Sequence, residues 1–206
     1  GQVLRQLDTE IVSFVHARLR KAGIDLIFND SIAAFEGGSR LSLQLESGAR
    51  IDTDMAILAI GVQPESSLAM DCGLECGVKG SIIVNEYMET SIKDIYADGD
   101  AVQVKNYITG EDTVIPLAGP ANKQGRIAAD NICGLGSTYR GSLGSSVIKI
   151  FDMTAAFTGL NEKTVRAQGL NFDKIILSPS SHAGYYPGGT AMTMKVLFDK
   201  DSDRIL

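Results

Sequence analysis

Apolar side chains recur every three or four residues in some segments of this chain and every second residue in others. The first spacing is typical of helices and the second of strands, so the sequence predicts a mixed α/β protein. Residues 7–22 carry apolar side chains at spacings of three and four, which predicts a helix that ends at Gly23. Residues 41–45 alternate between leucine and polar side chains, which predicts a half-buried strand. Residues 49–52 are expected to pair with it as a hairpin, and residues 32–35 to be extended.

Four further segments, rich in apolar side chains, predict strands. They lie at residues 24–28, 55–60, 82–84 and 95–97. The run 55–60 is apolar throughout, so we expect it to be buried on both faces. The run 95–97 leads directly into Asp98-Gly99-Asp100. Ligands of open α/β sheets bind at such strand ends, and a buried carboxylate there needs a partner, such as the hydroxyls of a sugar or sugar alcohol.

The remaining elements are predicted from turn and cap residues. A short helix is expected over 68–74, and a longer one over 121–132, with Pro120 just before it and Gly134 beyond its end. Residues 137–145 read as a loop and a domain boundary. After this loop we expect strands at 147–151, 154–158, 174–177 and 191–198, and a helix capped by Asn161.

Composition excludes several kinds of partner. The 206 residues carry a net charge of −6 and no cluster of Lys and Arg, so neither nucleic acid nor an anionic membrane is expected as a partner. No apolar run approaches the ~18 residues of a membrane span, and no signal peptide is visible. The three cysteines predict reduced, structural thiols in a cytoplasmic protein. They are too few for a zinc site and have no nearby histidine, so no metal site is expected.

Four segments in order resemble the pyridine nucleotide-disulfide oxidoreductase family. They are residues 55–64, 95–100, 116–126 and 182–188. Each segment is moderately specific, but the four in register span essentially the whole chain. The most similar branch is the group of CoA-disulfide reductases and NADH oxidases. The resemblance implies an α/β chain with parts of two Rossmann-like dinucleotide-binding domains, followed by a mixed α+β dimerisation domain.

The resemblance also implies a flavin site. Gly61 matches the end of a family strand, Gly99 lets the backbone approach FAD, and Asp100 hydrogen-bonds its ribityl chain. Leu117 and Ala118 lead into a helix whose free N–H groups would face the flavin. Two plainer interpretations stay open, because the carboxylates could be solvated loop groups and the helix an ordinary capped core helix.

Four further residues are implied to serve the substrate. A tyrosine of the pair Tyr185-Tyr186 reaches across the dimer in this family, where its hydroxyl hydrogen-bonds or protonates a sulfur species. Nothing in the sequence decides between the two tyrosines, and one ring would also suit packing in a dimer interface. Asn122 resembles a position that touches the CoA substrate in this branch, and His182 could polarise the substrate site. A plain exposed asparagine and a histidine in a turn are the alternatives.

The chain lacks two features that the family carries, namely a Gly-x-Gly-x-x-Gly turn and the upstream active-site cysteine. We therefore expect residues 1–63 to be the second half of an NAD(P)H domain, 64–136 the end of an FAD domain, and 137–206 a truncated dimerisation domain. The expected parent is a homodimer that passes electrons from NAD(P)H through FAD to a disulfide or persulfide linked to CoA or another small thiol. The chain alone is expected to be inactive. The alternatives are an NADH oxidase or peroxidase of the same family and a non-catalytic interaction module.

Overall fold

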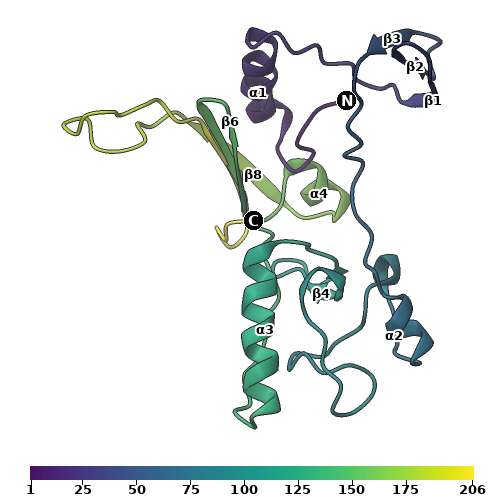
Figure 1. Ribbon diagram of the computed structural model, residues 1–206. Helices are drawn as coiled ribbons and strands as arrows, with labels where there is room; N and C mark the ends of the chain where they lie inside the picture. Colours follow the sequence, from purple (N-terminus) through teal and green to yellow (C-terminus); the bar gives the residue numbers. More distant parts are fainter.

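The computed structural model describes residues 1–206 (Figure 1). The helices are α1 (Thr9–Lys21), α2 (Ser67–Asp71), α3 (Ala118–Ile132) and α4 (Glu162–Ala167), with 3-10 turns η1 (Val78–Gly80) and η2 (Gly99–Ala101). The strands are β1 (Ile32–Glu36), β2 (Leu41–Leu45), β3 (Arg50–Thr53), β4 (Val104–Lys105), β5 (Asp112–Thr113), β6 (Ser146–Ile150), β7 (Met153–Phe157), β8 (Phe172–Leu177) and β9 (Met194–Asp199). They form one three-stranded antiparallel sheet, β1–β2–β3, and three antiparallel hairpins.

The predicted N-terminal helix is confirmed as α1, and its termini suit the helix dipole. Glu10 lies in the first turn and basic side chains lie in the last, which places each charge next to the opposite end of the dipole. Gly23 follows the helix with φ of +83°, a left-handed conformation that glycine adopts without strain. Val12 and Val15 are the buried side chains of this helix.

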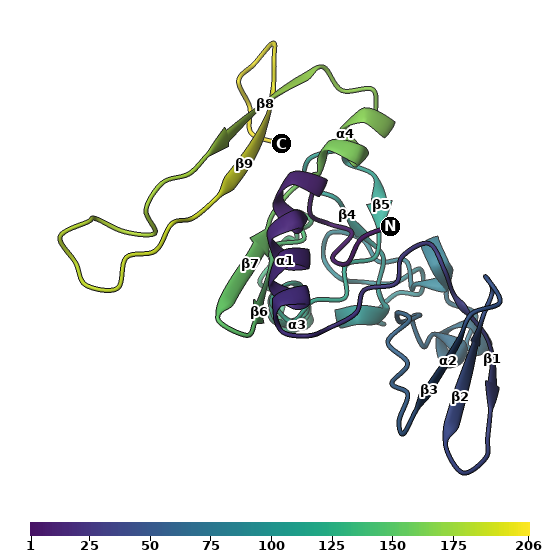
Figure 2. The ribbon, with the colours of Figure 1, turned by 90° about the horizontal axis from the view of Figure 1, so that it is seen from above.

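Helix α1 packs on the C-terminal part of the chain rather than on the strands that follow it in sequence. Val12 and Val15 join Leu7 and Ala155 of β7 in one apolar cluster. Figure 2 shows α1 beside β6 and β7, while the β1–β3 sheet lies apart on the other side. Arg18 adds an ion pair to Asp152 in the β6–β7 turn, so the far end of α1 is attached to the same hairpin.

A cluster of charges holds the start of α1 against the same C-terminal part. Lys195 of β9 has a side chain only 3% exposed, and its Nζ lies 3.0 Å from Asp8, 3.1 Å from Glu10 and 2.6 Å from Glu162. Asp8 also accepts a hydrogen bond from the backbone N–H of Glu162 at 3.0 Å. Carboxylates at the starts of α1 and α4 therefore surround the buried Lys195 ammonium group of β9. Together with Lys174 of β8, which is partly exposed, they form what we call the Lys195 cluster.

The predicted strand at residues 41–45 is confirmed as β2, although its burial does not alternate strictly, because Ser42 is buried as well as Leu43. In β2, Leu43 and Leu45 are buried, and Leu43 pairs with Ile51 of β3. The expected hairpin partner at 49–52 is observed at 50–53, and the expected extended segment at 32–35 is β1.

The four segments expected to be strands at 24–28, 55–60, 82–84 and 95–97 are not strands, and these predictions are wrong. Residues 24–28 and 55–60 form no strand, and Ile57 and Ile60 are 83% and 91% exposed. Ile82 and Tyr96 make only isolated bridges. An apolar run is stabilised as an inner strand only when other strands pair with its edges, and no segment of the described chain pairs with residues 55–60.

The middle of the chain packs around α3. Val102, Val104, Ile127 and Ala128 form its buried cluster together with Met88 and with Tyr139 from the expected boundary loop. Helix α3 starts at Ala118, three residues earlier than expected from Pro120, because a proline in the first turn of a helix loses no helical hydrogen bond.

The C-terminal elements confirm the sequence predictions. β6 and β7 pair as the expected hairpin, and Asn161 caps α4 by accepting a hydrogen bond from the Thr164 N–H at 2.9 Å. β8 and β9 pair over six residues each and continue as a long two-stranded loop, residues 178–193, that projects away from the body in Figures 1 and 2. We call β8, β9 and this loop the ribbon.

The Lys195 cluster makes stability sensitive to acid. Hydrogen bonds from Lys174, Lys195 and Arg166 lower the pKa of Glu162 from 4.5 to about 2. A lowered carboxylate pKa stabilises the fold above the ordinary pKa, and this contribution is lost as the pH falls toward 2. We expect the free energy of unfolding in urea to fall between pH 5 and pH 2.5, with Glu162 contributing on the order of 2 kcal/mol.

Glu162→Gln should be less stable at pH 7 and should lose less over that pH range. Glu46→Gln, which alters an exposed carboxylate outside the cluster, is the control and should retain the full acid dependence. Parallel pH curves for Glu162→Gln and the unchanged protein would contradict the assignment.

Candidate functional site

The turn at Gly99 is shaped by its backbone. Gly99 has φ of +87°, and a side chain added there would meet no atom within 4 Å. The position therefore requires glycine for its conformation and not for lack of space. Asp98 and Asp100 are both exposed, so the expectation of a buried carboxylate is wrong. The Asp100 oxygens are open to a ligand because the run before it is not an inner strand.

A buried glutamine ties this turn to α3. The Gly99 N–H donates to Oε1 of Gln124 at 2.9 Å, and Gln124 is only 1% exposed. A Cβ on Gly125 would lie 3.5 Å from Oδ1 of Asp98, so the turn and the helix approach each other closely. Gln124 was not among the residues predicted for the site. Its signal was a polar side chain at i−3 and i−4 from the buried Ile127 and Ala128.

The first turn of α3 leaves backbone donors open. Leu117 is the N-cap residue, with an extended backbone and no side-chain cap. Ala118 and Gly119 are exposed, and no acceptor in the chain receives their N–H groups. Pro120 carries no N–H, and the Ala121 N–H bonds to the Leu117 carbonyl at 3.1 Å. Two amides at the positive end of a helix therefore face solvent and suit an electron-rich oxygen.

The structure brings the turn and the helix start to one region. Gln124 lies two turns into α3, so the Gly99 turn is held ~10 Å along the helix from Leu117. Asn122 is exposed within those first turns. The expected cofactor residues Gly99, Leu117 and Ala118 thus share one end of α3.

Gly61 lies outside this region. It has φ of +111°, is exposed, and has no atom within 4 Å of an added Cβ. Its segment is the extended connection between the β1–β3 sheet and α2, which Figure 1 shows apart from α3. The glycine suits a turn, but the described chain gives it no neighbour to approach.

The aromatic residues of the ribbon form a second, separate group. Tyr185 and Tyr186 are 83% and 62% exposed, with ring centroids 4.9 Å apart. The His182 ring lies edge-on to Tyr186 at 6.3 Å, and its Nδ1 lies 3.1 Å from the Ala183 carbonyl. Figures 1 and 2 show the ribbon extending away from α3, so one chain does not bring these side chains to the Gly99 turn.

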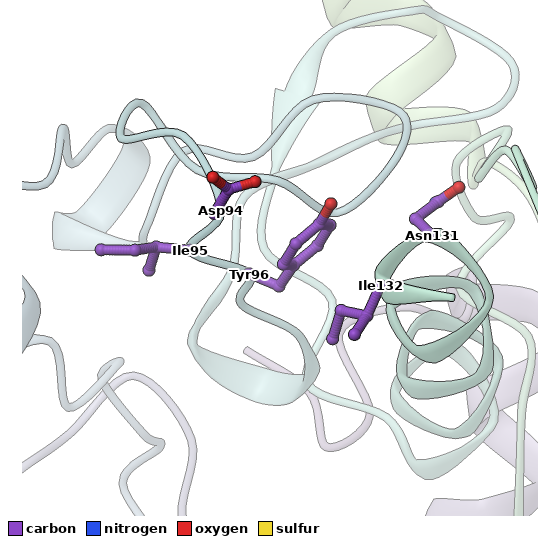
Figure 3. Close-up of a pocket in the computed structure, with 5 residues that line it drawn as sticks. All are labelled: Asp94, Ile95, Tyr96, Asn131 and Ile132. Carbon is purple, nitrogen blue, oxygen red and sulfur yellow. The ribbon is translucent and has the colours of Figure 1, made fainter. Parts of the chain in front are cut away.

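An open depression at the other end of α3 belongs to neither group. It has a volume of about 540 Å³ and is lined by Asp94, Ile95, Tyr96, Asn131 and Ile132 (Figure 3). It lies at the C-terminal end of α3, ~20 Å from the open amides at the other end. The Asn131 amide already donates to the Tyr87 and Ser137 carbonyls, so it serves the fold. None of the expected site residues lines this depression.

The three cysteines are free thiols. Cys72 and Cys133 are exposed and Cys76 is partly buried. No group of three or more His, Cys, Asp or Glu side chains is arranged to hold a metal ion.

Comparison with family models identifies both parts of the chain. Residues 1–125 match the model of pyridine nucleotide-disulphide oxidoreductases, and residues 145–206 match the dimerisation domain of the same family. None of the helices has the length and apolar character needed to cross a membrane.

Individual proteins give a more specific similarity. The chain is 34% identical over 206 residues to a CoA-dependent NAD(P)H sulfur oxidoreductase of Pyrococcus furiosus, covering 100% of this chain and 46% of that protein. It is 37% identical to an NADH oxidase of Methanocaldococcus jannaschii, covering 97% of this chain and 45% of that protein. The crystal structure of reduced Bacillus anthracis CoADR-RHD is similar, with 48% identity and a TM-score of 0.95, over 99% of this chain and 37% of that one. The chain thus spans less than half the length of these proteins.

The bond between Gly99 and Gln124 predicts a stability effect. Gln124→Met keeps the approximate size of the side chain but leaves the Gly99 N–H without its acceptor. We expect the free energy of unfolding in urea to fall by about 1–2 kcal/mol. Lys123→Met, at the neighbouring exposed position, is the matched control and should leave the midpoint unchanged. Equal midpoints for both variants would show that the bond does not hold the turn.

Proposed function

The chain belongs to the pyridine nucleotide-disulphide oxidoreductase family, and from this we propose that it is part of a homodimeric FAD enzyme that carries electrons from NAD(P)H to a disulfide or persulfide. The observation that carries the proposal is the Gly99 turn. It is fixed by the buried Gln124 beside an open helix start, in a chain similar to a CoA-dependent sulfur oxidoreductase.

The residues at the start of α3 fit an FAD. The exposed Asp100 carboxylate would accept hydrogen bonds from the ribityl hydroxyls, and Gly99 has no side chain to keep the ligand away. The free N–H groups of Ala118 and Gly119 would donate to a flavin oxygen and stabilise negative charge there, with Leu117 setting the helix start. When bound, FAD would accept a hydride from NAD(P)H and pass electrons to sulfur.

The domain assignment follows the same proposal. Residues 1–63 would belong to an NAD(P)H-binding domain, 64–136 to the FAD-binding domain and 137–206 to the dimerisation domain. Gly61 would then approach the dinucleotide from the connection between the β1–β3 sheet and α2. The exposed apolar side chains of residues 55–60 would be covered by other parts of the full-length protein.

The ribbon would serve the substrate side. We assign one hydroxyl of Tyr185 or Tyr186 to the active site of the partner subunit, where it would donate a proton to a sulfur leaving group. The other ring would pack in the dimer interface, and Asn122 and His182 would contact a CoA-linked substrate. The match of residues 145–206 to a dimerisation domain supports this arrangement.

The three free cysteines support a reducing, cytoplasmic location. A second candidate activity is reduction of oxygen, because the chain is 37% identical to a protein described as an NADH oxidase.

One assay separates these activities. The full-length protein that carries this chain should contain FAD and oxidise NADH or NADPH when CoA-disulfide or CoA-persulfide is supplied. A rate that depends on oxygen alone would favour the oxidase. Absence of flavin, together with no oxidation of NADH or NADPH by CoA-disulfide, CoA-persulfide or oxygen, would refute the proposal and favour a non-catalytic module.

Asp100→Asn tests the flavin contact. The substitution removes the negative charge and replaces one carboxylate oxygen with an NH2 group. The side chain can then accept fewer hydrogen bonds from the ribityl hydroxyls. We expect FAD affinity to fall about 10- to 100-fold, measured as flavin retained after dialysis, because such a charge-assisted bond contributes roughly 1.5–3 kcal/mol. Asp71→Asn alters an exposed carboxylate of α2 and should retain FAD fully.

Removing single hydroxyls tests the ribbon. One of Tyr185→Phe and Tyr186→Phe should lower kcat for the sulfur substrate by 10²-fold or more, in line with the loss of a general acid, and the other should have a small effect. Reduction of the flavin by NAD(P)H should be unchanged in both. Tyr107→Phe removes a half-exposed hydroxyl elsewhere and serves as the control. Full activity in both ribbon variants would exclude a tyrosine acid.

A further inference from the structure

The base of the ribbon is anchored by its two lysines. Lys195 of β9 pairs with Ile176 of β8, and Lys174 of β8 pairs with Leu197 of β9. Directly paired residues share a face of a hairpin and so do residues two apart, so the two lysines lie diagonally on one face. Both reach the same oxygen, because Oε2 of Glu162 is 2.8 Å from Lys174 Nζ and 2.6 Å from Lys195 Nζ.

The carboxylates of the Lys195 cluster come from outside the ribbon. Asp8 and Glu10 lie at the start of α1, and Glu162 is the first residue of α4. Lys195 contacts all three, and Lys174 also lies 3.4 Å from Glu10. Arg166 pairs with Glu162, so three acidic and three basic groups balance one another. The ribbon base is therefore attached to two helices at once.

The rest of the ribbon has no such attachment. Residues 178–192 are exposed throughout. Their hydrogen bonds run between the two sides of the ribbon, as from the Ser181 N–H to the Thr190 carbonyl at 2.8 Å. The direction of the whole projection is consequently set where β8 and β9 meet α1 and α4.

We propose that Lys195 and Lys174 are positioning residues that aim Tyr185 and Tyr186. This inference rests on the proposed function of those tyrosines. The extended chain from Lys195 to the tyrosines reaches ~25–30 Å, so a tilt of only ~5° at the base moves the tip by ~2 Å. A misplacement of ~1 Å at a reacting group costs as much as 10²-fold in rate. Ion pairs at the base thus control proton donation at the tip.

Buried ion pairs suit this task. A lysine in a nearly closed site is held by discrete hydrogen bonds, and its attraction to several carboxylates outweighs the cost of burial only in one geometry. Apolar packing at the same place would tolerate sliding of the ribbon on the helices, whereas a displaced ammonium group would lose its partners.

The test compares Lys195→Met, Lys174→Met and Lys195→Arg in the full-length protein, with Lys163→Met as the control. Lys163 lies beside Glu162 on α4 but is exposed and makes no ion pair. Lys174 is 38% exposed, so its variant folds even where the Lys195 change prevents folding. Stopped-flow mixing with NAD(P)H measures flavin reduction, and turnover with CoA-disulfide or CoA-persulfide measures the sulfur step. Hydrogen exchange over residues 172–199 reports the ribbon directly.

Lys195→Met and Lys174→Met should lower the sulfur step about tenfold or more, with unchanged flavin reduction and faster exchange in the ribbon. Lys195→Arg should recover most of the rate, and Lys163→Met should match the unchanged protein. An unchanged sulfur step, or an equal loss in both half-reactions, would overturn the positioning role. If the unchanged protein reduces no sulfur substrate, the proposed function fails. In that case hydrogen exchange still tests the attachment of the ribbon. Exchange over residues 172–199 that Lys195→Met leaves unchanged would overturn the claim that Lys195 holds the base of the ribbon.

Discussion

A single buried ammonium group organises the contact between the two ends of this chain. Lys195 near the C-terminus has a side chain only 3% exposed, and a charge in such a place requires opposite charges around it. The carboxylates come from Asp8 and Glu10, about 185 residues earlier, and from Glu162. Burial lowers the lysine pKa, but the hydrogen bonds to these carboxylates outweigh it, and the pKa lies above its ordinary value. The ammonium stays charged, and α1 stays on the C-terminal part.

A neutral hydrogen bond has the corresponding role in the middle of the chain. Gln124 accepts a hydrogen bond from the Gly99 N–H at a buried position on α3, and so it aligns an exposed turn with the open start of that helix.

Residues 55–60 show what happens where a segment has no such partner. Ile57 and Ile60 are strongly apolar, yet they are almost fully exposed because no strand pairs with their segment. Apolar character alone therefore does not specify burial, whereas a specific partner does.

This contrast explains which features the sequence predicts. Elements with their signals nearby are predicted correctly, as in the α1 helix, the alternating leucines of β2 and the Asn161 cap of α4. Inner strands fail because their stability depends on pairing with segments elsewhere, which no local pattern reports. The site divides in the same way. Gly99 is found from its turn, but Gln124 and Lys195 are missed because their partners lie 25 and more residues away.

The two groups of site residues impose one further condition. The Gly99 turn and the α3 start lie on the body, whereas Tyr185 and Tyr186 lie in the projecting part of the ribbon, residues 178–192, which is exposed throughout. An acid must come within hydrogen-bond distance of the atom that it protonates, so the tyrosines of one chain cannot act at its own Gly99 turn in this conformation. If both groups act in one reaction, a second copy must supply the tip. The rigid attachment at Lys195 then matters twice, because it fixes the ribbon on its own chain and thereby its reach into the partner.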